Sequence, residues 1–124
     1  MDRVIEFEGL RVLMCARQGF PLQTAEDAND FLSMAWSQRA DLLAIPEERL
    51  GADFLRLSSR VAGEVFQKFV NYQLRCAIVG DITTALNSSE SLQDFVRETN
   101  KGSAIWFVAD LDQLRAKVAA VKKN

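Results

Sequence analysis

Three short, nearly unbroken runs of apolar residues constrain this chain more than any other feature. They occupy residues 41–45, 76–79 and 105–108, and proline, glycine or aspartate follows each within two residues. A strand with one solvent-exposed face alternates apolar and polar residues, whereas a strand covered on both faces is apolar along its whole length. The three runs therefore predict interior strands of a parallel sheet.

Segments with the periodicity of amphipathic helices separate and follow these runs. The second segment, from Asp53 through Tyr72, is predicted as one helix, the longest in the chain. Trp36 falls on the apolar face of the first segment, which predicts a buried side chain. Residues 81–88 have little pattern and are predicted as a loop. The expected helix caps are Thr24 with Asp27, Asp53 alone, Ser91 with Asp94, and Asp110 with Gln113.

Two further apolar segments, residues 4–7 and 10–16, flank Glu8-Gly9 near the start of the chain. Glycine allows the backbone conformation of a tight turn, so the two segments predict a hairpin. The order of elements is typical of the α/β class. We expect one domain over residues 1–124, with a mostly parallel five-stranded sheet and about four helices.

Charge and residue composition limit the classes of partner that this chain is expected to bind. The net charge is -2 and the basic residues are dispersed, which argues against nucleic acid. The beginning of the chain has neither the pattern of a signal peptide nor that of a membrane span, so we expect a cytoplasmic protein without membrane contact. Cys15 and Cys76 lie in apolar runs, as buried free thiols do. The chain has no histidine, which excludes both the usual zinc-ligand set and a serine–histidine catalytic pair. We expect no cofactor.

The segment before the second run carries a row of polar residues. Arg60, Glu64 and Lys68 stand four residues apart, a spacing that allows a ladder of ion pairs on a solvated helix face. A glycine inside a helix, such as Gly63, costs about 1 kcal/mol of stability relative to alanine. Its presence is explained if another backbone approaches closely and needs the space that a side chain would fill. The alternative is therefore a contact surface for a loop of this chain or for another protein. It comprises Arg60, Gly63, Glu64, Gln67, Lys68, Asn71 and Tyr72.

Three carboxylates follow the apolar runs. Glu47, Asp81 and Asp110 leave the expected strands at their carboxyl ends, where open α/β sheets bind ligands. Together they would hold a magnesium ion or orient a hydroxyl group. The alternative makes Asp110 a helix cap, Asp81 a turn residue and Glu47 a solvated side chain. Residues 100–102, Asn-Lys-Gly, fit a helix stop signal better than a phosphate cradle.

This plan resembles the STAS domain, the sulphate-transporter and anti-sigma-factor-antagonist module of bacteria. In that family a serine near the start of a helix is phosphorylated, and the nearest counterparts here are Ser58 and Ser59, although Leu57 replaces the usual preceding aspartate. The resemblance implies a regulatory α/β module.

A second resemblance covers most of the chain. The sequence is similar to the bacterial family named domain of unknown function 4180, which implies a bacterial cytoplasmic setting and no particular activity. The residues that carry it are Ala62-Gly63-Glu64, Gln67-Lys68-Phe69, Asn71-Tyr72, Ala77-Ile78-Val79-Gly80-Asp81, Ser91-Leu92, Asp94-Phe95 and Asn100-Lys101-Gly102.

We therefore expect a non-enzymatic regulatory or protein-interaction module that contacts another protein or its own copy through the second helix. The alternative is a small-molecule or metal-binding protein, or an enzyme, that uses the carboxyl edge of the sheet.

Overall fold

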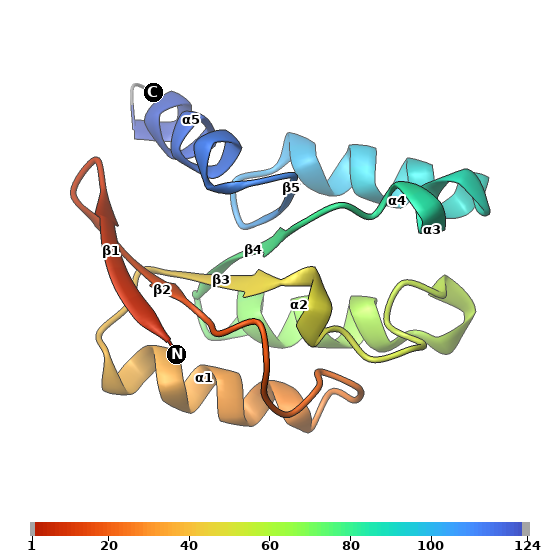
Figure 1. The fold of residues 1–124 in the computed structure, drawn as a ribbon, viewed down its shortest axis with the longest axis horizontal. Helices are drawn as coiled ribbons and strands as arrows, with labels where there is room; N and C mark the ends of the chain where they lie inside the picture. Colours follow the sequence, from red (N-terminus) through yellow and green to blue (C-terminus); the bar gives the residue numbers. More distant parts are fainter. Residues whose placement is uncertain (1, 123–124) are drawn as a thin grey trace.

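A computed structural model describes residues 2–122 (Figure 1). Hydrogen-bonded strands and helices alternate along the chain after an initial hairpin. The elements are β1 (Arg3–Phe7), β2 (Leu10–Met14), α1 (Asp27–Ser37), β3 (Leu42–Pro46), η1 (Glu47–Arg49), η2 (Leu57–Ser59), α2 (Val61–Asn71), β4 (Arg75–Val79), α3 (Thr83–Asn87), α4 (Glu90–Lys101), β5 (Ile105–Val108) and α5 (Leu111–Lys122). No helix of residues 2–122 is both long enough and apolar enough to cross a membrane.

The five strands form one sheet in the order β1-β2-β3-β4-β5. β1 and β2 pair antiparallel, and the remaining pairs are parallel. Glu8 and Gly9 both have positive φ, 49° and 83°, as the two central residues of a type I′ hairpin turn require. The α/β class, the hairpin and the three strands predicted from the apolar runs are confirmed. β3 and β4 are interior strands as predicted, whereas the prediction of an interior position for residues 105–108 was wrong, because β5 is an edge strand whose two faces are nevertheless buried.

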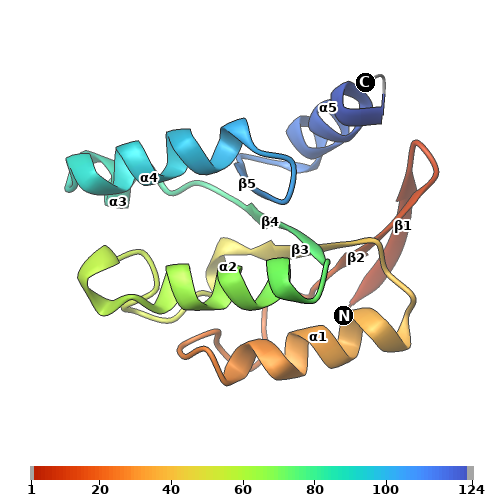
Figure 2. The same ribbon diagram turned by 180° about the vertical axis from the view of Figure 1, so that it is seen from behind.

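The helices cover the two faces of the sheet unequally. α1, α2 and α4 pack on one face around a large cluster that includes Phe31, Phe66 and Phe69. α5 packs on the other face through Leu114 and Val118. Figure 1 shows α5 on the opposite side of the strands from α1 and α2, and Figure 2 shows α2 lying between α1 and α4. Within the described residues, one helix thus covers a face of a five-stranded sheet.

The second helix begins later than predicted. α2 starts at Val61, and Arg60 before it has a φ of 66°, which no α-helix accommodates. The hydroxyl of Ser59 explains the break, because it lies 2.7 Å from the carbonyl oxygens of both Asp53 and Arg56 and accepts a bond from the Val61 N–H. Such local side-chain bonds compete with helical ones. The prediction of one long helix capped by Asp53 was wrong.

Other local predictions had mixed outcomes. The Asp110–Gln113 cap is confirmed: the Gln113 N–H donates to Asp110 and the Ala109 N–H donates to Gln113, both at 2.9 Å. The predicted loop at 81–88 contains the short helix α3, and Ser89 rather than Ser91 caps α4 through the Leu92 N–H. Trp36, predicted to be buried, is 51% exposed.

Candidate functional site

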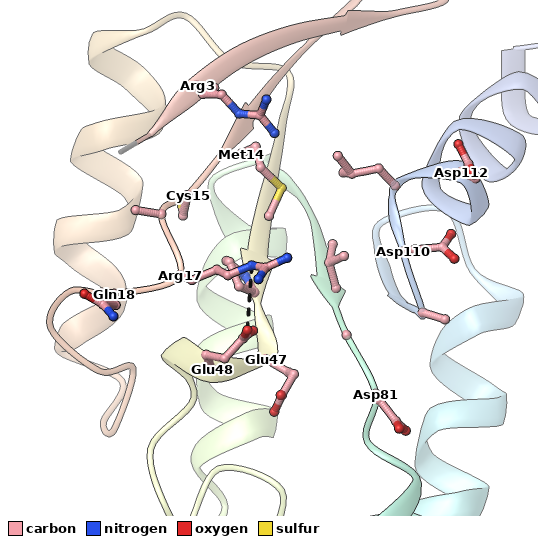
Figure 3. A pocket seen from close by; sticks show the side chains of 16 residues that line it. Arg3, Met14, Cys15, Arg17, Gln18, Glu47, Glu48, Asp81, Asp110 and Asp112 are labelled. Atoms are coloured by element: carbon pink, nitrogen blue, oxygen red, sulfur yellow. Dashed lines mark ion pairs between the residues drawn. The ribbon is translucent and has the colours of Figure 1, made fainter.

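A cleft of about 980 Å³ opens at the carboxyl ends of the parallel strands (Figure 3). Met14 and Val79 of the sheet line it together with Leu111 at the start of α5. All three belong to the cluster on the face of the sheet that α5 covers. This edge is where α/β sheets generally bind ligands.

Glu47 is held at this cleft by the absence of a side chain at Gly80. A Cβ atom on Gly80 would collide with Cγ of Glu47, and the φ of +145° at Gly80 also favours glycine. The end of β3 can therefore pack directly on the end of β4. Within the described part of the chain, the Glu47 carboxylate has no hydrogen-bond or ion-pair partner.

Asp81 and Asp110 line the same cleft but also have local structural roles. The Thr83 N–H donates to Asp81 at 2.9 Å. Hydrogen bonding by the Thr83 side chain, and secondarily this backbone bond, lowers the pKa of the exposed Asp81 carboxyl. Asp110 caps α5 through the Gln113 N–H. The three carboxylates predicted at the sheet edge thus border one cleft, with two of them serving as turn and cap.

Two arginines line the side of the cleft opposite Asp81 and Asp110. Figure 3 shows Arg3 and Arg17 across the opening from Asp81 and Asp110. Arg17 lies 3.8 Å from Glu48, and both side chains are largely exposed, so this ion pair contributes little to stability. Among residues 2–122, no three carboxylate or cysteine side chains are grouped closely enough to hold a metal ion.

A buried arginine beside the cleft was missed by sequence analysis. Arg49 is 4% exposed and donates at 2.9 Å to the carbonyl oxygens of Ala16 and Phe20. Its guanidinium lies 5.0 Å from the Phe20 ring centre and 5.1 Å from that of Phe31. It thereby fixes the loop that carries Arg17. In the sequence, Arg49 looks like any loop arginine, and nothing local marks it as buried.

The outer face of α2 forms a second, shallower groove of about 510 Å³. Six of the seven residues predicted for the contact surface line it, and we call them the α2 surface: Gly63, Glu64, Gln67, Lys68, Asn71 and Tyr72. The seventh, Arg60, lies just before the helix.

The contacts on the α2 surface differ from those expected. None of the ion pairs within residues 2–122 joins Glu64 to Arg60 or Lys68, so the predicted charge ladder is absent there. A Cβ atom at Gly63 would meet nothing within 4 Å, which rules out close approach by the described part of this chain. Gln67 donates to Asn71 at 2.8 Å.

Tyr72 of the α2 surface pairs with a second exposed aromatic residue, Trp36. The rings of Trp36 on α1 and Tyr72 at the end of α2 lie 5.4 Å apart in an edge-to-face arrangement. They are 51% and 53% exposed. The groove is thus flanked by a pair of large side chains that remain half in water.

The remaining predicted positions are apart from both features. Ser58 is exposed, whereas the Ser59 hydroxyl is occupied by backbone bonds. Cys15 and Cys76 are buried free thiols, and burial raises the pKa of Cys15 to about 12 and that of Cys76 well above its ordinary value. Neither thiol is a nucleophile at neutral pH in this setting.

Comparison with known proteins gave one match. The model of the family described as "Domain of unknown function (DUF4180)" matches residues 7–118. No curated protein and no solved structure matched the chain.

Proposed function

The chain belongs to the family described as Domain of unknown function (DUF4180), and from this premise we propose that it is a non-enzymatic, cytoplasmic regulatory module that binds a protein through the α2 surface. The family description names no activity, so the proposal depends on surface chemistry. Its partner is another protein or a second copy of the chain.

The exposed Trp36–Tyr72 pair carries this proposal. Tryptophan and tyrosine are enriched among the residues that dominate binding energy at protein interfaces. Here they border a groove whose other residues are polar and whose Gly63 leaves open space. Because the inner side of α2 is already packed into the core through Phe66 and Phe69, only the outer side is open to a partner.

Site-specific photo-crosslinking tests the proposal and works whichever protein the partner is. A photoreactive amino acid at position 67, in the centre of the α2 surface, should give a covalent protein adduct in the native host. The same group at position 116, exposed on α5 across the sheet, is the matched control. Tyr72→Ala combined with Trp36→Ala should abolish the adduct at position 67. If position 67 gives no more adduct than position 116, the α2 surface is not a protein-binding surface.

A second candidate function is small-molecule binding in the cleft, favoured by its size of about 980 Å³ and its charged lining. A ligand there should raise the melting temperature in a screen of metabolites and divalent cations. Glu47→Gln should remove that shift, and Glu90→Gln on α4 should preserve it. A screen in which no compound shifts the wild-type protein counts against this candidate.

The resemblance to STAS domains adds a subsidiary proposal, phosphorylation at Ser58 or Ser59. Exposure favours Ser58, because the Ser59 hydroxyl is bonded to backbone carbonyls. Phosphopeptide mapping of the protein purified from its host should locate the group on Ser58. Absence of phosphate from both serines under all growth conditions would remove this proposal.

A further inference from the structure

The charges on the α2 surface are arranged for a second copy of the same chain. At 3.6 residues per turn, Glu64 and Lys68 lie on one flank of the outer face of α2, and Gly63 and Val70 lie on the other. Gln67 lies between the flanks. The two residues on each flank are therefore complementary. Glu64 and Lys68 are an acid and a base, and the exposed apolar side chain of Val70 fits the open space above Gly63.

Both pairs are centred at nearly the same point of the helix. Glu64 and Lys68 are equidistant from Phe66, and Gly63 and Val70 are equidistant from the bond between Phe66 and Gln67. A twofold axis that crosses two antiparallel helices at this point reverses residue order while keeping each flank on its own side. It would place Glu64 beside Lys68 of the second copy on one flank, and Gly63 beside Val70 of the second copy on the other.

The contacts within one chain leave these features available. Glu64 has no ion-pair partner among residues 2–122, and Lys68 reaches only the Ala25 carbonyl oxygen, at 3.5 Å. Val70 is 43% exposed, and the space above Gly63 is open. Figure 2 shows α2 as the middle one of three helices on this side, and no further layer of residues 2–122 lies over its outer face.

We propose that the partner at the α2 surface is a second copy of this chain, paired antiparallel through α2 about a twofold axis near Gln67. The inference rests on the proposed function and names the partner for the same surface. Arg60 and Tyr72 are also equidistant from Phe66, so the arginine of each copy comes near the tyrosine of the other. A single 11-residue helix is shorter than standard interfaces require, and the Trp36–Tyr72 pair extends the contact toward α1.

Charge reversal tests the geometry. In Glu64→Lys, lysine faces lysine at both symmetric contacts, and in Lys68→Glu, glutamate faces glutamate. Each single variant should dimerise about tenfold more weakly than wild type in sedimentation equilibrium. The double variant should recover wild-type affinity. An equimolar mixture of the two single variants should form a heterodimer, because every contact is then between opposite charges.

Asp112→Lys on α5 is the matched control, with the same charge change on the other side of the sheet and no expected effect on dimerisation. A wild-type protein that sediments as a monomer at several hundred micromolar overturns the inference. So does a dimer that neither the double variant nor the mixture restores.

Photo-crosslinking at position 67 separates this inference from the proposed function. An adduct with the mass of two chains agrees with both. An adduct with a different protein, formed by a chain that is monomeric in sedimentation, leaves the proposed function in place and overturns the second-copy inference. No adduct at all overturns both.

Discussion

The side chain of Asn100 serves as a substitute for a missing strand. Its Nδ2 donates to the Phe107 carbonyl oxygen at 3.2 Å, and its Oδ1 accepts from the Phe107 N–H at 2.7 Å. β5 is an edge strand, so without Asn100 both groups of Phe107 would lack these partners at a part-buried site. Asn100→Ala should therefore lower the free energy of unfolding by about 1–3 kcal/mol, measured by urea denaturation.

Asn29→Ala provides the comparison for that measurement. Asn29 is exposed on α1, and its side chain makes no hydrogen bond within the described residues, so this change should stay within about 0.5 kcal/mol of wild type. Equal effects of the two substitutions would show that the bonds to Phe107 contribute nothing to stability.

The two thiols have a pH dependence that follows from burial. The pKa of Cys15 rises from 9.0 in its ordinary setting to about 12 in the folded protein, chiefly by burial and secondarily through Asp2. Stability linked to Cys15 is therefore fully present below pH 9.0 and declines as the pH rises toward about 12. At pH 8, a thiol reagent should label neither Cys15 nor Cys76 in the native protein, and should label both in denaturant. Fast native labelling would contradict the burial of these residues.

At the scale of elements, the break in the helix before α2 depends on one of two adjacent serines. The Ser59 hydroxyl bonds to the backbone at Asp53, Arg56 and Val61, whereas Ser58 is exposed and its side chain has no such bond in the described part of the chain. Ser59→Ala should cost about 1 kcal/mol of unfolding free energy, as loss of a helix cap does. Ser58→Ala should cost less than about 0.5 kcal/mol. Thermal and urea unfolding of the two variants measure this difference. Equal losses of unfolding free energy would contradict the role of the Ser59 hydroxyl in the break before α2.

The same serine shows where sequence reasoning reached its limit. Uninterrupted apolar runs at residues 76–79 and 105–108 predicted strands correctly. A strand buried on both faces is apolar at every position, and this run can be recognised in the sequence without knowing the fold. The start of α2 was missed because Ser59 competes for carbonyls six and three residues earlier, a choice that periodicity does not record. Capping by Ser89 instead of Ser91 was missed for a similar reason, since both serines precede residues suited to a first turn.

For the whole molecule, the candidate sites were predictable to the extent that topology places them. The carboxyl ends of parallel strands share one edge, so Glu47, Asp81 and Asp110 had to lie near one another. The burial of Arg49 depends on a loop folding back over it, which no local pattern encodes. The exposure of Trp36 likewise depends on how much of α1 the neighbouring helix covers, and periodicity alone assigned it to the core.

The two tryptophans of the chain report on the proposed assembly independently. Trp36 is 51% exposed beside the α2 surface, whereas Trp106 is 1% exposed in the core under α5. At low protein concentration, iodide should quench the fluorescence of Trp36 and spare that of Trp106. As concentration rises through the dimerisation range, the quenchable fraction should fall, because the second copy covers Trp36. The Trp36→Phe variant isolates Trp106 and should show little quenching at any concentration. A quenchable fraction that stays constant while sedimentation reports dimers would place the dimer interface away from the Trp36–Tyr72 pair.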